Sequence, residues 1–105
     1  MIFIFGPLWS GKRAFARDAL GCDASVCDAQ ELARSRADLE TLADELAANA
    51  VVIASEVGGG VVPAERAERE ARERAGRLTC LLAERAETVV RVFCGIPTVL
   101  KGRLP

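Results

Sequence analysis

Histidine and tyrosine are absent from the sequence, and tryptophan occurs once, at Trp9. Without imidazole side chains the chain cannot use histidine as a general base, a phosphate carrier or a metal ligand. An excess of one charge is also missing, because 14 basic residues stand against 15 acidic ones. This balance argues against a broad surface for nucleic acid, although it leaves room for a small local phosphate site.

Long apolar runs are missing as well, and the few cysteines are widely spaced. The apolar opening, residues 1–6, is far too short to cross a membrane and lacks the basic start of a signal peptide. No CxxC pair occurs, and a zinc site would need all four cysteines at unusual spacing. We therefore expect reduced thiols in a cytoplasmic protein without a membrane partner, and keep disulfides or a metal site as alternatives. The cysteines are Cys22, Cys27, Cys80 and Cys94.

Strand-like and helix-like segments alternate along the 105 residues, a length that fits one domain. We expect no structure in the tail, residues 98–105. The alternation predicts a mostly parallel sheet of about four strands that is flanked by helices. Strands are predicted over residues 1–5, 24–28, 51–54 and 88–94, and helices over residues 10–20, 29–48 and 63–87.

A glycine-containing loop between the first strand and the first helix gives the strongest chemical signal. It has the pattern G-x4-G-K, in which glycines let backbone N–H groups turn towards phosphate oxygens and the lysine reaches the β- and γ-phosphates. The pattern predicts an α/β, P-loop NTPase-like three-layer fold, with residues 1–105 forming a single nucleotide-binding domain. The alternative is a turn that merely joins strand to helix. The predicted nucleotide-binding residues are Gly6, Pro7, Leu8, Trp9, Ser10, Gly11, Lys12 and Arg13.

The residue after the lysine departs from the pattern. A serine or threonine normally stands there, because its hydroxyl ligates Mg²⁺. Here the position is Arg13, and a guanidinium can only pair with anions. Binding of ATP or GTP is therefore expected, while the usual placement of Mg²⁺ is in doubt.

Two carboxylates follow predicted strands, at the sheet edge where ligands bind in parallel α/β folds. Asp28 ends the second predicted strand, where it could hold a metal through water or equally cap the next helix. Glu56 follows the strand over residues 51–54, where it could face the ligand or lie in solvent.

Three segments in the second half of the sequence carry a family resemblance. Residues 55–63 read SEVGGGVVP, residues 75–78 read AGRL, and residues 95–101 read GIPTVLK. They are similar to the N-E-V-G-x-G-I-V-P, A-G-R-L-N-Q and closing G-x-P-x-x-L-K segments of the adenosylcobinamide kinase/adenosylcobinamide-phosphate guanylyltransferase family of cobalamin biosynthesis, and residues 10–12 fit its phosphate loop. The resemblance covers roughly residues 1–20 and 50–101.

The chain also differs from the family. Family members are longer, and the region missing here, between the first helix and Val51, carries the histidine that becomes guanylylated. This chain has no histidine, so that covalent step cannot take the family's route. Arg13 replaces the metal-binding hydroxyl, Ser55 stands for the usual asparagine, and Thr79-Cys80 stand for asparagine and glutamine.

The resemblance implies a function. The family phosphorylates a hydroxyl of adenosylcobinamide with ATP or GTP and then attaches GMP. By this resemblance Lys12 and Glu56 would be catalytic, Asp28 would help to hold Mg²⁺, and the chain would form a homo-oligomer. We expect a nucleoside-triphosphate-binding protein that retains at most the kinase step on adenosylcobinamide. The alternative is a non-catalytic protein with a regulatory or scaffold role in corrinoid metabolism.

Overall fold

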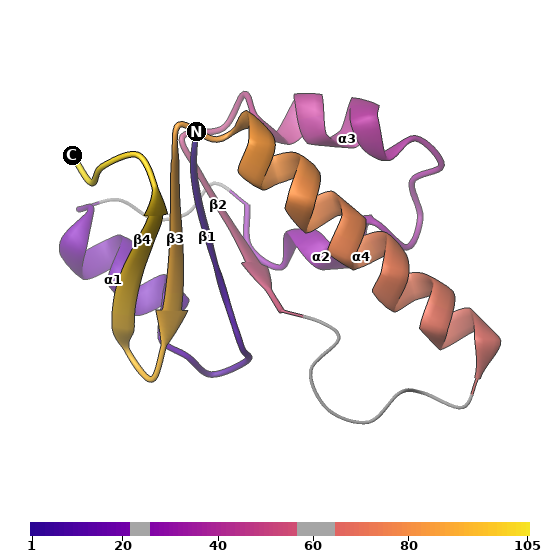
Figure 1. Ribbon diagram of the computed structural model, residues 1–105, viewed down its shortest axis with the longest axis horizontal. Helices are drawn as coiled ribbons and strands as arrows, with labels where there is room; N and C mark the ends of the chain where they lie inside the picture. The colour runs from indigo at the N-terminus through magenta and orange to yellow at the C-terminus, as the bar shows by residue number, and fades with distance from the viewer. Residues whose placement is uncertain (22–25, 57–64) are drawn as a thin grey trace.

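Four strands form one mixed sheet in the order β2-β1-β3-β4 in the computed structural model, which describes residues 1–21, 26–56 and 65–105 (Figure 1). β1 pairs in parallel with β2 on one side and with β3 on the other, and β4 pairs antiparallel with β3. The predicted mostly parallel α/β sheet is thereby confirmed. The elements are β1 (Ile2–Gly6), α1 (Lys12–Ala19), α2 (Ala29–Leu32), α3 (Leu39–Leu46), β2 (Val51–Ser55), α4 (Arg66–Arg85), β3 (Thr88–Phe93) and β4 (Ile96–Lys101).

The inner strands are buried on both faces, which explains their nearly continuous apolar sequences. Alternate side chains of β1 enter different cores, with Phe3 on one face and Ile4 on the other. The first core contains apolar residues of α2, α3 and α4, and the second contains Phe15, Ala16 and Leu20 of α1 and the residue that follows it. Helices therefore cover both faces of the sheet, with α1 on one side and the other three on the opposite side (Figure 1).

Residues 29–48 do not form the single helix that their periodicity predicts; they form α2 and α3 with a break between them. The side chain of Asp38 starts α3, because it accepts a hydrogen bond from the backbone N–H of Thr41 at 3.2 Å. On the other side of the break, the guanidinium of Arg74 donates to the carbonyls of Ala33 and Arg36. These bonds satisfy backbone groups that a continuous helix would have paired, so the break is stabilised from both ends.

Two further predictions are corrected at the edges of the sheet. The strand predicted over residues 24–28 is reduced to one parallel bridge between Val26 and Val52, and residues 24–25 lie outside the described part of the chain. The tail predicted to lack structure, residues 98–105, begins inside β4, which runs to Lys101. Cys94 and Gly95 both have positive φ, 53° and 75°, which is the backbone of a tight hairpin turn. The chain therefore reverses at this turn and enters a fourth strand.

The strand β4 lies at the edge of the sheet, and each of its residues is exposed. Pro97 is tolerated there because an edge strand has an unpaired side. Among the described helices, none is long and apolar enough to cross a membrane.

Leu82 provides a test of the core between α4 and the sheet. Its side chain is fully buried, so Leu82→Ala should lower the free energy of unfolding by about 2–5 kcal/mol through lost burial and a residual cavity. Leu100→Ala makes the same truncation on β4, where the side chain is 56% exposed, and should cost much less. Urea denaturation of both variants measures the difference, and equal losses would contradict this assignment of the core.

Candidate functional site

The loop from Gly6 to Arg13 leaves the carboxyl end of β1 and enters α1 through a tightly constrained backbone. A Cβ atom on Gly6 would lie 2.1 Å from the carbonyl oxygen of Val92, so only glycine fits at the start of the loop. Trp9 and Gly11 both adopt positive φ, 62° and 91°. These two left-handed residues turn the backbone sharply within the loop. The local sequence thus produces the turned backbone that a phosphate loop requires.

The β3–β4 hairpin supports this loop. The backbone N–H of Gly95, in the hairpin turn, donates to the carbonyl oxygen of Ser10 at 2.8 Å. A Cβ on Gly11 would meet the Cα of Gly95 at 3.4 Å, so the two backbones are in close contact. A loop near the start of the sequence is therefore held by a turn near residue 95.

Lys12 bends back into the loop. Its side-chain nitrogen Nζ donates to the carbonyl oxygen of Pro7 at 2.6 Å and lies 3.5 Å from Oγ of Ser10. Burial lowers the pKa of Lys12, although the charges of Asp28 and Glu56 oppose that shift. An anion in the loop would favour the charged ammonium, so the site gains electrostatically from a negatively charged ligand.

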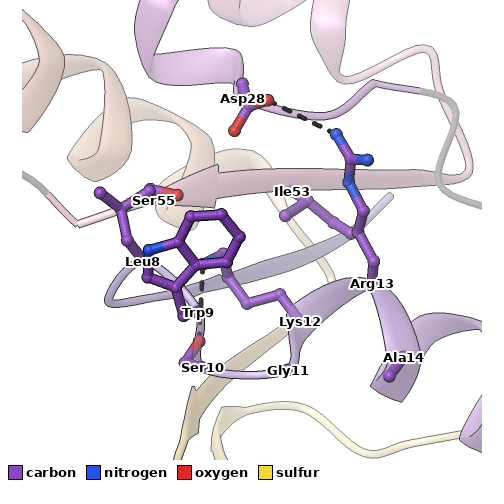
Figure 2. Close-up of a pocket in the computed structure, with 10 residues that line it drawn as sticks. All are labelled: Leu8, Trp9, Ser10, Gly11, Lys12, Arg13, Ala14, Asp28, Ile53 and Ser55. Carbon is purple, nitrogen blue, oxygen red and sulfur yellow. Dashed lines mark hydrogen bonds and ion pairs between the residues drawn. The ribbon is translucent and has the colours of Figure 1, made fainter.

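A pocket of about 450 Å³ opens beside the loop (Figure 2). It lies at the carboxyl end of the parallel strands, where ligands bind in such sheets. Six of the predicted nucleotide-binding residues, Leu8 to Arg13, line it, together with Asp28; Gly6 and Pro7 are not among the described residues that do. The residues that the sequence analysis did not select are Ala14, Ile53 and Ser55.

Ser55 is the most informative of these additions. It is the last residue of β2, it is buried, and its backbone N–H is held by Oε1 of Gln30 at 2.9 Å. A polar residue that ends a buried parallel strand was a usable signal, since the preceding residues 51–54 are all apolar. Its position places a hydroxyl-bearing residue at the wall opposite the first turn of α1.

Arg13 and Asp28 form an ion pair across the mouth of the pocket, with Nη2 of the arginine 3.5 Å from Oδ2 of the aspartate. Figure 2 shows the arginine extending from α1 towards the aspartate, away from Lys12. Asp28 precedes α2, but its side chain makes no capping hydrogen bond to the described helix. Of the two alternatives for Asp28, helix capping is therefore wrong, and a role at the pocket remains a prediction.

The donor set does not fit a magnesium ion. Arg13 has no lone pair to offer, and Asp28, the predicted metal residue, is already paired with it. Two hydroxyl-bearing residues line the pocket, and neither follows the lysine in the loop: Ser10 Oγ lies against the Lys12 ammonium, and Ser55 ends β2. Among residues 1–21, 26–56 and 65–105, no three acidic or cysteine side chains gather into a group that could hold a metal.

Glu56 follows β2 and pairs with Arg91 of β3. Two nitrogens of the Arg91 guanidinium donate to the carboxylate: Nε to Oε1, and Nη2 to Oε2 at 3.0 Å. This pairing lowers the pKa of Glu56 and raises that of Arg91. Arg91 in turn lies over the ring of Phe93, 5.3 Å from its centre. Glu56 is therefore a stabilised carboxylate beside the pocket; it is not among the described residues that line it.

Sequence analysis did not select Arg91, although a signal was present. It interrupts an otherwise apolar strand, and a cation at such a position usually has a specific partner. The register of the parallel sheet brings that position next to β1 and so near the edge where Glu56 lies.

Comparison with protein-family models gives a match to cobinamide kinase / cobinamide phosphate guanyltransferase over residues 22–100. The matched range contains Glu56, Arg91 and the hairpin turn, and the loop from Gly6 to Arg13 precedes it. A search of curated proteins finds no match. Because the family match spans well over half of the sequence, the chain belongs to the cobinamide kinase/cobinamide phosphate guanyltransferase family of cobalamin biosynthesis.

Proposed function

We propose that the protein binds a nucleoside triphosphate in the pocket beside the Gly6–Arg13 loop. The observation that carries the proposal is the buried ammonium of Lys12, which the loop backbone surrounds at the edge of a 450 Å³ pocket. The first turn of α1 adds its positive end to the same place, so backbone and side chain both favour phosphate. The family match supports the same class of ligand.

If the chain is an enzyme, the kinase step on a cobinamide hydroxyl is the one its residues allow. The acceptor oxygen would attack the γ-phosphorus, the bond to the β–γ bridging oxygen would break, the nucleoside diphosphate would leave, and the hydroxyl proton would pass to solvent. Lys12 would stabilise charge on the phosphates, and Glu56 would orient the acceptor hydroxyl by accepting its hydrogen bond. Guanylyl transfer through a histidine cannot follow, because the sequence has none.

A specific observation favours the second function, a non-catalytic nucleotide-binding protein with a regulatory or scaffold role in corrinoid metabolism. The Arg13–Asp28 pair stands where a kinase of this loop type would place its metal ligands. Such a protein would keep the phosphate loop and its affinity and would have no phosphoryl transfer.

Replacing Lys12 tests the binding site. Lys12→Ala should weaken ATP or GTP binding by at least about tenfold, because it removes a charge-assisted contact to phosphate. Isothermal titration calorimetry measures this, and the thermal stabilisation given by the nucleotide should fall in parallel. Lys101→Ala is the matched control, since this lysine binds the carbonyls of Ala83 and Glu84 at the end of α4. Equal affinities for Lys12→Ala and the unaltered protein would overturn the assignment of the loop.

Transfer of label separates the two functions. The protein is incubated with adenosylcobinamide and γ-labelled ATP or GTP, with and without Mg²⁺. Label that enters the corrinoid in the unaltered protein and not in Lys12→Ala would establish the kinase. Saturable triphosphate binding without labelled corrinoid would establish the non-catalytic function.

The pairing of Glu56 with Arg91 predicts a pH dependence of stability. The pKa of Glu56 is lower in the folded protein than its ordinary value of 4.5, so the pair stabilises the fold above that value. The stabilisation should disappear as the pH falls through the lowered pKa of the folded state. Arg91→Gln removes the pair and should flatten the loss of unfolding free energy on acidification, measured by urea denaturation at several pH values. Arg103→Gln, in the tail, is the control and should leave the slope unchanged; an identical slope in both variants would contradict the pairing.

A further inference from the structure

We propose that Arg13 replaces the divalent cation, so that this pocket binds the triphosphate free of Mg²⁺. The inference rests on the proposed nucleotide binding and adds to it the ionic form of the ligand. The loop pattern predicts a phosphate site that also holds a metal ion. The side chains found at that site, Arg13 above all, do not fit a metal ion.

The position of Arg13 is the first argument. It is the second residue of α1 and follows Lys12, so both cations begin at the helix end that faces the pocket. Lys12 is buried and its ammonium turns into the loop, whereas the side chain of Arg13 is 70% exposed and extends along the other side of the pocket (Figure 2). A polyphosphate chain lying over the loop would meet one cation on each side.

The chemistry of the guanidinium is the second argument. It offers several N–H donors in a plane, matches two phosphate oxygens at once, and keeps its charge at any relevant pH. A magnesium ion supplies charge to the same oxygens and, besides phosphate and water, usually takes one or two oxygen ligands from the protein. Arg13 provides the charge without those ligands, and its own charge would repel a cation placed beside it.

Asp28 supplies the third argument, because it holds Arg13 in place. The two side chains are about half to two-thirds exposed and 3.5 Å apart, so solvent screens the pair and a phosphate can compete for the guanidinium. In this arrangement Asp28 is the partner that Arg13 would exchange for a phosphate when the ligand binds.

Binding of ATP and of GTP should be measured by calorimetry in two buffers, one with EDTA and one with excess Mg²⁺. The fluorescence of Trp9, the single tryptophan and a pocket residue, gives a second readout in the same samples. The unaltered protein should bind at least as tightly in EDTA as in Mg²⁺.

Arg13→Ser carries the decisive comparison. In EDTA it should weaken binding by about 10- to 100-fold, because a charged hydrogen-bonding group is lost. Excess Mg²⁺ should restore part of the affinity to this variant alone, since a hydroxyl can then ligate the ion. The control is Arg17→Ser, which removes the same charge one helical turn further along α1, where the arginine pairs with Asp18, and should bind as the unaltered protein does.

Asp28→Asn distinguishes the two roles of the aspartate. If Asp28 is only the partner that Arg13 exchanges for phosphate, its loss removes a competing carboxylate, and affinity in EDTA should stay the same or rise a few-fold. Circular dichroism of each variant verifies that the fold is retained. A loss of affinity confined to the Mg²⁺ buffer would identify Asp28 as a metal ligand and overturn the inference.

The remaining outcomes are equally distinct. Binding by the unaltered protein only in Mg²⁺ would overturn the inference and leave the proposed function intact. Equal affinity of Arg13→Ser and the unaltered protein in EDTA would also overturn it. Absence of binding in both buffers would overturn the inference and the proposed function together.

Discussion

The close approach between the end of β1 and the carbonyl of Val92 is the constraint on which the site depends. At 2.1 Å there is no room for a side chain on Gly6, so the two parallel strands can meet at their carboxyl ends only if this residue is glycine. The loop that follows then turns over the end of the sheet. Its carbonyl at Ser10 reaches the N–H of Gly95, and the position of Lys12 follows from that contact.

Charge at this edge of the sheet is arranged in two separate pairs. Glu56, which follows β2, pairs with Arg91 of β3. Asp28, which precedes α2, pairs with Arg13 of α1. In the first pair, two nitrogens of the Arg91 guanidinium donate to the Glu56 carboxylate, and both side chains are less exposed than those of the second pair. This pair lies next to β1, so the sheet fixes its geometry. The second pair is looser and more exposed, as the proposed exchange of Asp28 for a phosphate requires.

Sequence patterns predicted β1, β2 and β3 well, because a strand that is buried on both faces must consist almost entirely of apolar residues. The apolar runs at residues 1–5, 51–54 and 88–94 each match a strand of the sheet to within one residue at either end. Prediction failed where tertiary contacts decide the local structure. The break between α2 and α3 depends on Arg74, far away in the sequence, and β4 is a strand only because it pairs with β3.

The candidate site shows the same division. The loop pattern identified six residues that line the pocket, since spacing in a loop is a local property. Ser55 and Arg91 were not selected, because their relevance arises from strand register and from neighbours on other strands. Conversely, capping was a local interpretation of Asp28, whereas its backbone is left-handed, its side chain makes no capping hydrogen bond, and its carboxylate pairs with Arg13 of another helix.

The contact between Ser10 and Gly95 has a consequence for the order of folding. It joins residues that are separated by most of the sequence, and such contacts carry a high entropic cost of closure. Proteins that depend on distant pairings fold more slowly than those built from local ones. The loop from Gly6 to Arg13 would therefore acquire its final shape only after the β3–β4 hairpin has docked, so a nascent chain would have the loop sequence well before it has the proposed binding site.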